Sequence, residues 1–244
     1  NKLLTLSIVS LGSVTFLLTL GAPYVAKFFA STMEGKWFTL TVAFAYWCLP
    51  QIFFYGMYTV LGQILNAREN FGPYMWAPVL NNVVSIVGFL GVLRVFGGAE
   101  RGSIEEWDST RVMLLGGVST AGIAVQALVL VWPMRNLGIR YRPDFAWRGS
   151  GLGEAGKASW WMLLMMVSGM VPTMLLSNVA AGARSRAEGM GLSGDVAGNA
   201  AYDSAYALYS MPTSLIVVSI ATAMFTRLTK AAVDGDMARM RRDA

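Results

Sequence analysis

The residues of this sequence that could carry chemistry are polar side chains spaced along otherwise apolar segments. Two stripes of this kind are Gln51, Tyr55, Tyr58, Gly62 and Asn66, and Pro78, Asn81, Asn82, Ser85 and Gly88. Steps of three and four residues place most members of each set on one side of a helix. Amide side chains need hydrogen-bond partners in hydrocarbon, so such faces turn either toward packed protein or toward a water-filled path. The spacing leaves both interpretations open.

A third stripe contains Asp203, Tyr206, Ser210 and Ser214, and Asp203 is the only acidic residue within the apolar segments. A carboxylate at the centre of a bilayer costs ~3 kcal/mol on insertion scales. Asp203 is therefore either a hydrated carboxylate near the membrane surface or a functional group that binds a cation or proton, or that pairs with an arginine. The candidate residues for a substrate or ion pathway are Gln51, Tyr55, Asn66, Asn81, Asn82, Asp203, Tyr206 and Ser210.

The sequence lacks the residues that several kinds of catalytic and metal-binding site require. The sequence has no histidine and a single cysteine, Cys48, which excludes an intrachain disulfide and a cysteine-rich metal site. The only two adjacent acidic residues, Glu105 and Glu106, lie in a loop between apolar segments, and no glycine-rich phosphate-binding motif of the Walker type occurs. We therefore expect no enzyme, no metal and no cofactor.

Long apolar segments must position the polar stripes. Hydrophobic residues make up 55% of the 244 residues and charged residues only 14%, whereas a soluble domain has about 25% charged residues. A membrane-spanning helix needs about 20 mostly apolar residues. Six segments reach that length: Leu4–Ala30, Trp37–Leu65, Met75–Val95, Val112–Trp132, Ala158–Ala181 and Ala201–Thr226. The sequence predicts an all-α, polytopic membrane helix bundle with six transmembrane helices.

The charges between these segments orient the bundle. One side, which includes the segment Arg135–Lys157, collects 12 of the 19 Lys and Arg residues. Basic residues favour the cytoplasmic side, so we expect this side to be cytoplasmic. Arg135–Lys157 also interleaves basic and aromatic residues, which suits anionic membrane lipids. Nucleic-acid binding is not expected from a loop held between two membrane spans.

Two sequence regions resemble the MviN/MurJ family of lipid II flippases. The first reads Leu-Pro-Gln-Ile-Phe-Phe-Tyr-Gly at 49–56, Leu-Gly-Gln-Ile-Leu-Asn-Ala-Arg at 61–68, Phe at 71 and Ala-Pro-Val-Leu-Asn-Asn at 77–82. The second contains Tyr206, Pro212, Val-Val-Ser-Ile-Ala-Thr at 217–222 and Arg-Leu at 227–228. The resemblance covers most of the chain.

The resemblance implies an internal piece of a larger, two-lobed transporter of the multidrug/oligosaccharidyl-lipid/polysaccharide exporter type. Residues 1–134 would supply four helices of the first lobe, and 135–157 a cytoplasmic linker between the lobes. Residues 158–228 would supply the first two helices of the second lobe, and 229–244 a cytoplasmic segment. The family is thought to flip undecaprenyl-pyrophosphate-linked peptidoglycan precursor (lipid II) from the cytoplasmic to the outer leaflet by alternating access. The implied location is the bacterial inner membrane, and cell-wall synthesis proteins are possible partners.

Two positions depart from the family pattern. Ala207 stands where many members carry an arginine five residues before the proline, and Thr226 stands where a proline is common. Two alternatives therefore remain beside a lipid II flippase. One is an exporter of another polyprenyl-linked saccharide or of a small cation, and the other is a transport-inactive membrane scaffold for cell-wall synthesis.

Overall fold

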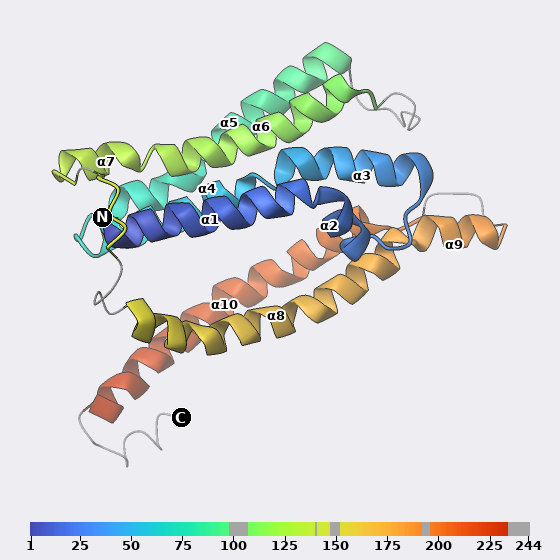
Figure 1. The fold of residues 1–244 in the computed structure, drawn as a ribbon. Coiled ribbons are helices and arrows are strands. Elements are labelled where there is room, and N and C mark those ends of the chain that lie inside the picture. The colour runs from blue at the N-terminus through green and yellow to red at the C-terminus, as the bar shows by residue number, and fades with distance from the viewer. Residues whose placement is uncertain (98–106, 140, 147–151, 192–195, 234–244) are drawn as a thin grey trace. The chain divides into compact units, whose positions relative to one another are not determined.

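The fold consists of helices joined by short connections. The computed structural model describes residues 1–97, 107–139, 141–146, 152–191 and 196–233, and within them it contains ten helices and no strand (Figure 1). The helices are α1 (Lys2–Leu20), α2 (Ala22–Phe29), α3 (Gly35–Cys48), α4 (Gln51–Asn66), α5 (Phe71–Phe96), α6 (Ser109–Leu128), α7 (Val131–Asn136), α8 (Leu152–Ala181), α9 (Ala183–Gly189) and α10 (Asn199–Val233). The predicted all-α class is confirmed.

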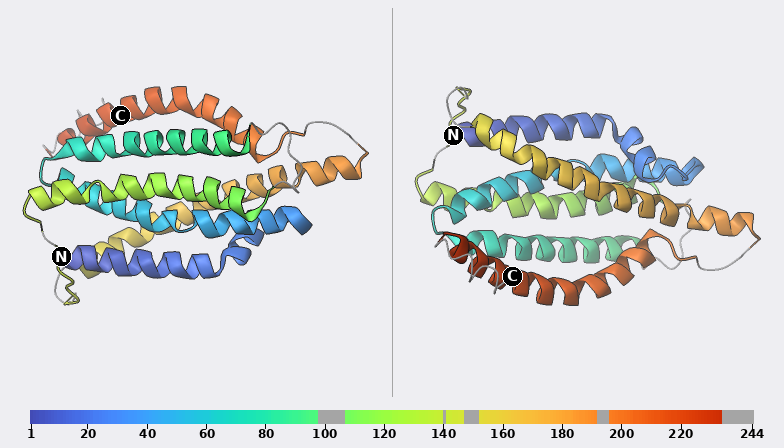
Figure 2. Two further views of the ribbon diagram at one scale, coloured as in Figure 1. Left: turned by 90° about the horizontal axis from the view of Figure 1, so that it is seen from above. Right: turned by 90° about the horizontal axis from the view of Figure 1, so that it is seen from below.

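The chain divides into two compact units, Asn1–Asn178 and Val179–Ala244. In the first unit, α6 packs against α3, α4 and α5, and α1 packs against α4. Two further views show α5 and α6 running side by side (Figure 2). The second unit contains α9 and α10. Residues 234–244, most of the expected cytoplasmic segment 229–244, lie outside the described residues.

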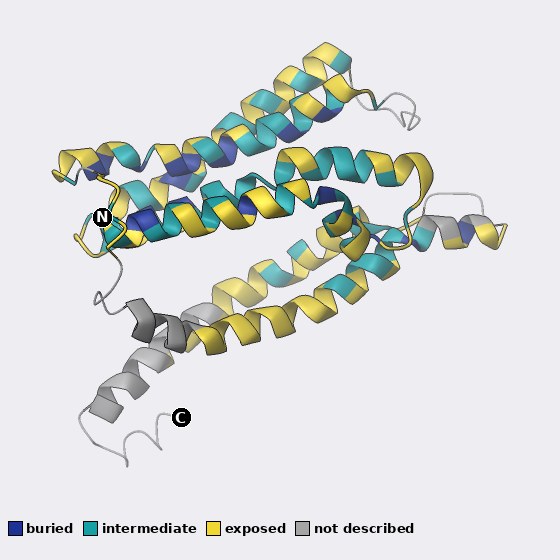
Figure 3. Cartoon of the chain, in the orientation of Figure 1, coloured by how far each residue is buried: buried dark blue, intermediate teal, exposed yellow. Residues whose placement is uncertain are grey.

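The core of the first unit forms where α1, α4, α6 and α7 meet, and the buried residues gather there in Figure 3. Its buried members are Leu4, Met57, Leu61, Leu65, Ala77, Ala127, Leu130 and Met134. Outside this core most large apolar side chains are exposed, including Ile86, Val87 and Leu90 along α5. An apolar exterior around a small core suits a helix bundle whose solvent is lipid.

Among the described residues, five helical stretches are long and apolar enough to cross a membrane: Lys2–Leu20, Gly35–Asn66, Phe71–Phe96, Ser109–Asn136 and Trp160–Ala181. They coincide with the first five expected spans. The sixth expected span, Ala201–Thr226, lies inside α10, a continuous helix of 35 residues. The predicted count of six spans is therefore approximate.

Two expected spans are divided by helix breaks. Leu4–Ala30 separates into α1 and α2 at Gly21, where Pro23 lies in the first turn of α2 and lacks the N–H that a continuous helix would use. Trp37–Leu65 separates into α3 and α4 at Leu49–Pro50. Pro78, Pro172 and Pro212, by contrast, lie inside the unbroken helices α5, α8 and α10.

Candidate functional site

A set of buried or half-buried polar side chains joins α4, α5 and α6, and we call it the polar seam. Its first part lies at the α3–α4 break. The Gln51 side chain donates hydrogen bonds from Nε2 to Thr120 Oγ1 at 2.9 Å and to Ser119 Oγ at 3.3 Å. Thr120 Oγ1 in turn donates to the backbone carbonyl of Trp47 at 2.6 Å. A hydroxyl of α6 thus satisfies a carbonyl in the last turn of α3.

The second part of the polar seam joins α5 to α6. Asn81 Nδ2 donates to Gln126 Oε1 at 3.0 Å, and Asn81 Oδ1 accepts from Ser85 Oγ at 3.3 Å. Gln126 is only 4% exposed, so the pair is well shielded. Gly122 allows this approach, because a Cβ built there would lie 2.3 Å from Asn81 Oδ1. Glycine is required at this point by the closeness of the two helices.

The remaining candidates of the first unit are not part of these bonds. Tyr55 is 47% exposed and Asn82 is exposed, both on the surface of the first unit. Asn66, the last residue of α4, has a buried Oδ1 that no described group bonds. Tyr58, in the same stripe, stacks on Tyr74 with ring centroids 4.8 Å apart and donates to the Tyr74 carbonyl at 3.1 Å.

The candidates of the second unit lie along α10. Asp203 and Tyr206 are exposed, and Ser210 donates to the carbonyl of Ala207 at 3.2 Å. The Tyr206 ring lies between those of Tyr202 and Tyr209, at centroid distances of 6.2 and 6.4 Å. This part of α10 therefore combines an exposed carboxylate with a row of tyrosines.

Asn178 is a polar residue that sequence reasoning missed. Its Oδ1 accepts from the Ser31 backbone N–H at 2.7 Å and from Ser31 Oγ at 2.5 Å, and its Nδ2 donates to the carbonyls of Phe28 and Met174. Ser177 adds a bond to the Phe29 carbonyl. These contacts fasten α8 to the end of α2. The available signal was an amide side chain inside an apolar run, which needs partners in hydrocarbon.

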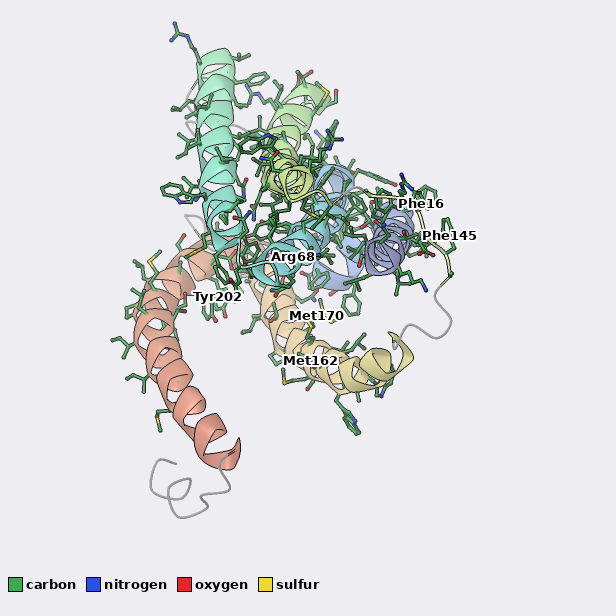
Figure 4. All side chains as sticks on the ribbon, turned by 90° about the vertical axis from the view of Figure 1, so that its left-hand side faces the viewer. Phe16, Arg68, Phe145, Met162, Met170 and Tyr202 are labelled. Carbon is green, nitrogen blue, oxygen red and sulfur yellow. The ribbon has the colours of Figure 1, made fainter. Side chains whose placement is uncertain are left out.

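The described part of the segment 135–157 is held against the start of α1. Thr5 Oγ1 accepts from the Asp144 backbone N–H at 3.0 Å and donates to Tyr141 Oη at 3.4 Å. The Arg142 backbone N–H donates to Asn1 Oδ1. Figure 4 shows the molecule with the start of α1 facing the viewer, and it labels Arg68 and Phe145. Arg140, Trp147 and Arg148 of the same segment lie outside the described residues.

Within the first unit the five candidates do not converge on one site, and the three candidates of the second unit share α10. Gln51 and Asn81 both bond to α6, Tyr55 and Asn82 lie on the surface, Asn66 lies at the end of α4, and the other three lie on α10. The polar seam is neutral, so it can position helices but cannot supply a charged acid or base. No cluster of three or more metal-ligating His, Cys, Asp or Glu side chains occurs among the described residues.

Long helices with exposed apolar side chains, joined to one another by buried amides and hydroxyls, define a polytopic integral membrane protein. A model of the family described as "Lipid II flippase MurJ" matches residues 1–244, and the chain belongs to this family. The MurJ family comprises bacterial membrane transporters rather than enzymes, and lipid II is the cargo that gives the family its description. The resemblance expected from the motifs at 49–82 and 206–228 is confirmed.

Proposed function

We propose that this chain forms part of a transporter that moves undecaprenyl-pyrophosphate-linked peptidoglycan precursor from the cytoplasmic to the outer leaflet of the bacterial inner membrane. The observation that carries the proposal is the family match over all 244 residues. Transport proceeds by alternating access, in which two helical lobes move about a central site. The division of the chain after Asn178 does not coincide with the expected linker at 135–157, so the lobes stay part of the proposal.

We propose two roles for the candidate pathway residues, according to whether their side chains have hydrogen-bond partners. Gln51 and Asn81 have partners on α6 and serve to fix α4 and α5 to it. Tyr55, Asn82, Asp203 and Tyr206 are exposed and are the better candidates to face the pathway. A carboxylate repels a pyrophosphate, so Asp203 acts in coupling: it binds a proton or a cation, or pairs with an arginine elsewhere in the transporter.

The test replaces Asp203 in the full-length protein, supplied as the sole flippase of a depletion strain. Asp203→Asn removes the charge and keeps the shape of the side chain. It should abolish growth rescue and the appearance of lipid II in the outer leaflet, while the amount of protein in the membrane stays near normal. Glu34→Gln is the matched control, because Glu34 is an exposed acid whose side chain forms no cap bond to α3. The control should rescue growth fully.

The outcomes separate the competing functions. Full rescue by Asp203→Asn would remove Asp203 from the coupling mechanism. Rescue of growth by the unaltered protein without any lipid II movement in reconstituted vesicles would favour the scaffold. Movement of another polyprenyl-linked saccharide in preference to lipid II would favour a different exporter of the same superfamily.

A further inference from the structure

A cavity of about 680 Å³ lies within the first unit, between α1, α4, α7 and the residues that follow α7. Its lining residues are Leu4, Ile8, Met57, Leu61, Val131, Met134, Arg135, Ile139 and Tyr141. The volume falls within the ~300–1,000 Å³ typical of pockets that hold small ligands. Apart from Arg135 and Tyr141, every side chain on the list is a hydrocarbon or a thioether.

More than half of the apolar side chains in the lining are buried in the core of the unit. Leu4, Leu61 and Met134 belong to the core of the unit, and each is at most 7% exposed. Met57, on the same face of α4 as Leu61, completes this wall. A cavity lined in this way offers water too few hydrogen-bond partners, so it suits an apolar occupant.

The polar part of the lining is fixed at the edge of the cavity. Tyr141 is held by its bond from Thr5 Oγ1, and Thr5 is itself buried. Arg135 lies in the last turn of α7 and is exposed, and its guanidinium has no hydrogen bond or ion pair with the residues that the structure describes. A cation beside an apolar cavity is the arrangement that a lipid with an anionic headgroup requires.

Other charges at the same end favour an anion. Lys2 lies in the first turn of α1, and Arg142 is placed beside it by the bond from its backbone N–H to Asn1 Oδ1. One carboxylate, Asp144, lies in the same segment, and its Oδ1 accepts from the Ala146 backbone N–H. Among Lys2, Arg135, Arg142 and Asp144, three side chains are basic and one is acidic, so the described residues beside the cavity carry a net positive charge.

We infer that the cavity binds one acyl chain of an anionic glycerophospholipid, whose phosphate lies against Arg135. The cavity is large enough for much of one acyl chain but not for a whole undecaprenyl tail. The bound lipid fills the gap between α1, α4 and α7 and stabilises the packing of these helices.

The experiment uses full-length protein in nanodiscs that contain phosphatidylglycerol with a photoreactive diazirine on its acyl chain. After irradiation, mass spectrometry should find crosslinks concentrated in peptides that contain residues 4–8, 57–61 and 131–141. Crosslinks spread evenly over lipid-facing helices, including the exposed face of α5, would overturn the inference. The same labelling with phosphatidylcholine tests the headgroup and should give weaker crosslinking at these peptides.

Arg135→Gln isolates the phosphate contact, and Arg94→Gln is its matched control. Arg94 is also an exposed arginine in the last turn of its helix, but it lies in α5, outside the cavity. One basic residue near an anionic membrane surface is worth ~1 kcal/mol, which is about fivefold in affinity. Arg135→Gln should therefore lower crosslinking by phosphatidylglycerol about fivefold, and Arg94→Gln should leave it unchanged.

Ile139→Trp tests the cavity itself, because the larger side chain fills space near its edge without touching the helices' hydrogen bonds. It should reduce acyl-chain crosslinking to both headgroups, with an unchanged elution volume in detergent as the check on folding. Equal effects of Arg135→Gln and Arg94→Gln would refute the phosphate contact. Stronger labelling by a photoreactive polyprenyl diphosphate than by phosphatidylglycerol would show that the site takes a prenyl chain, and the inference would be wrong.

Discussion

Gly122→Ala tests whether the contact between α5 and α6 is as close as the polar seam requires. The added methyl group would lie 2.3 Å from Asn81 Oδ1, 2.8 Å from Ser85 Oγ and 3.2 Å from the Asn81 carbonyl oxygen. Contacts this short force a neighbour to move. The Asn81 side chain can turn away only by giving up its bonds to Gln126 and Ser85.

The magnitude follows from three contributions. An interhelical hydrogen bond in a membrane protein is worth ~0.6 kcal/mol on average and at most ~1.7 kcal/mol. Crowding a packed site by one methyl group costs ~1–3 kcal/mol. Alanine gains ~1 kcal/mol over glycine from its helix propensity, which offsets part of this loss. We therefore expect Gly122→Ala to destabilise the protein by about 1–3 kcal/mol.

The assay is thermal unfolding of the purified full-length protein in detergent, followed by size-exclusion chromatography. Gly117→Ala is the matched control on the same helix, because a Cβ there meets Trp47 atoms only at 3.8 and 3.9 Å, an ordinary contact. Its melting temperature should stay equal or rise, while that of Gly122→Ala falls by about 2–4 °C for each kcal/mol. Adding Asn81→Ala to Gly122→Ala should restore stability above the additive value. Equal melting temperatures for the two glycine variants would refute the close α5–α6 contact.

Two other measurements address the topology and the anchoring of α8. In a Cys48→Ala background, an impermeant thiol reagent applied to intact cells should label Glu34→Cys, which is expected outside the cell, and not Asn136→Cys, which is expected in the cytoplasm. Labelling of Asn136→Cys alone would show that the orientation is the opposite of the expected one. Asn178→Leu should lower the melting temperature more than Ser31→Ala does. Asn178→Leu removes every hydrogen bond of the Asn178 side chain, whereas Ser31→Ala keeps the 2.7 Å bond from the Ser31 backbone N–H to Asn178 Oδ1. Equal effects of the two variants would mean that the Asn178 amide does not hold α8 against the end of α2.

The fold was predictable as far as it follows from the length and apolarity of single segments. Five of the expected spans coincide with long apolar helices because a run of about 20 apolar residues satisfies its backbone only as a helix in lipid. The break at Pro50 agrees with the loss of a backbone donor, yet Pro78 and Pro172 leave their helices continuous. Whether a proline divides a helix depends on neighbours such as Thr120, which the local sequence does not reveal.

The α4 and α5 members of the polar seam were predictable from the sequence, but their partners on α6 were not. Gln51 and Asn81 stood out as amides within apolar runs, but their partners lie 68–69 and 45 residues away along the chain. Those pairings depend on how far one helix is shifted and rotated against another. The roles of Asp203, Tyr206 and Ser210 stay predictions, because they concern a pathway that involves other helices.

The hydroxyl of Thr120 makes the bend between α3 and α4 a property of three helices rather than of one. The Trp47 carbonyl finds its partner on α6, so neither half of the broken span can swing freely without leaving that carbonyl unbonded in hydrocarbon. The hydrogen bond therefore fixes the angle between α3 and α4. During any conformational change of the transporter, α3, α4 and α6 would move together as one rigid body. The backbone rotations would then occur in connections outside these three helices.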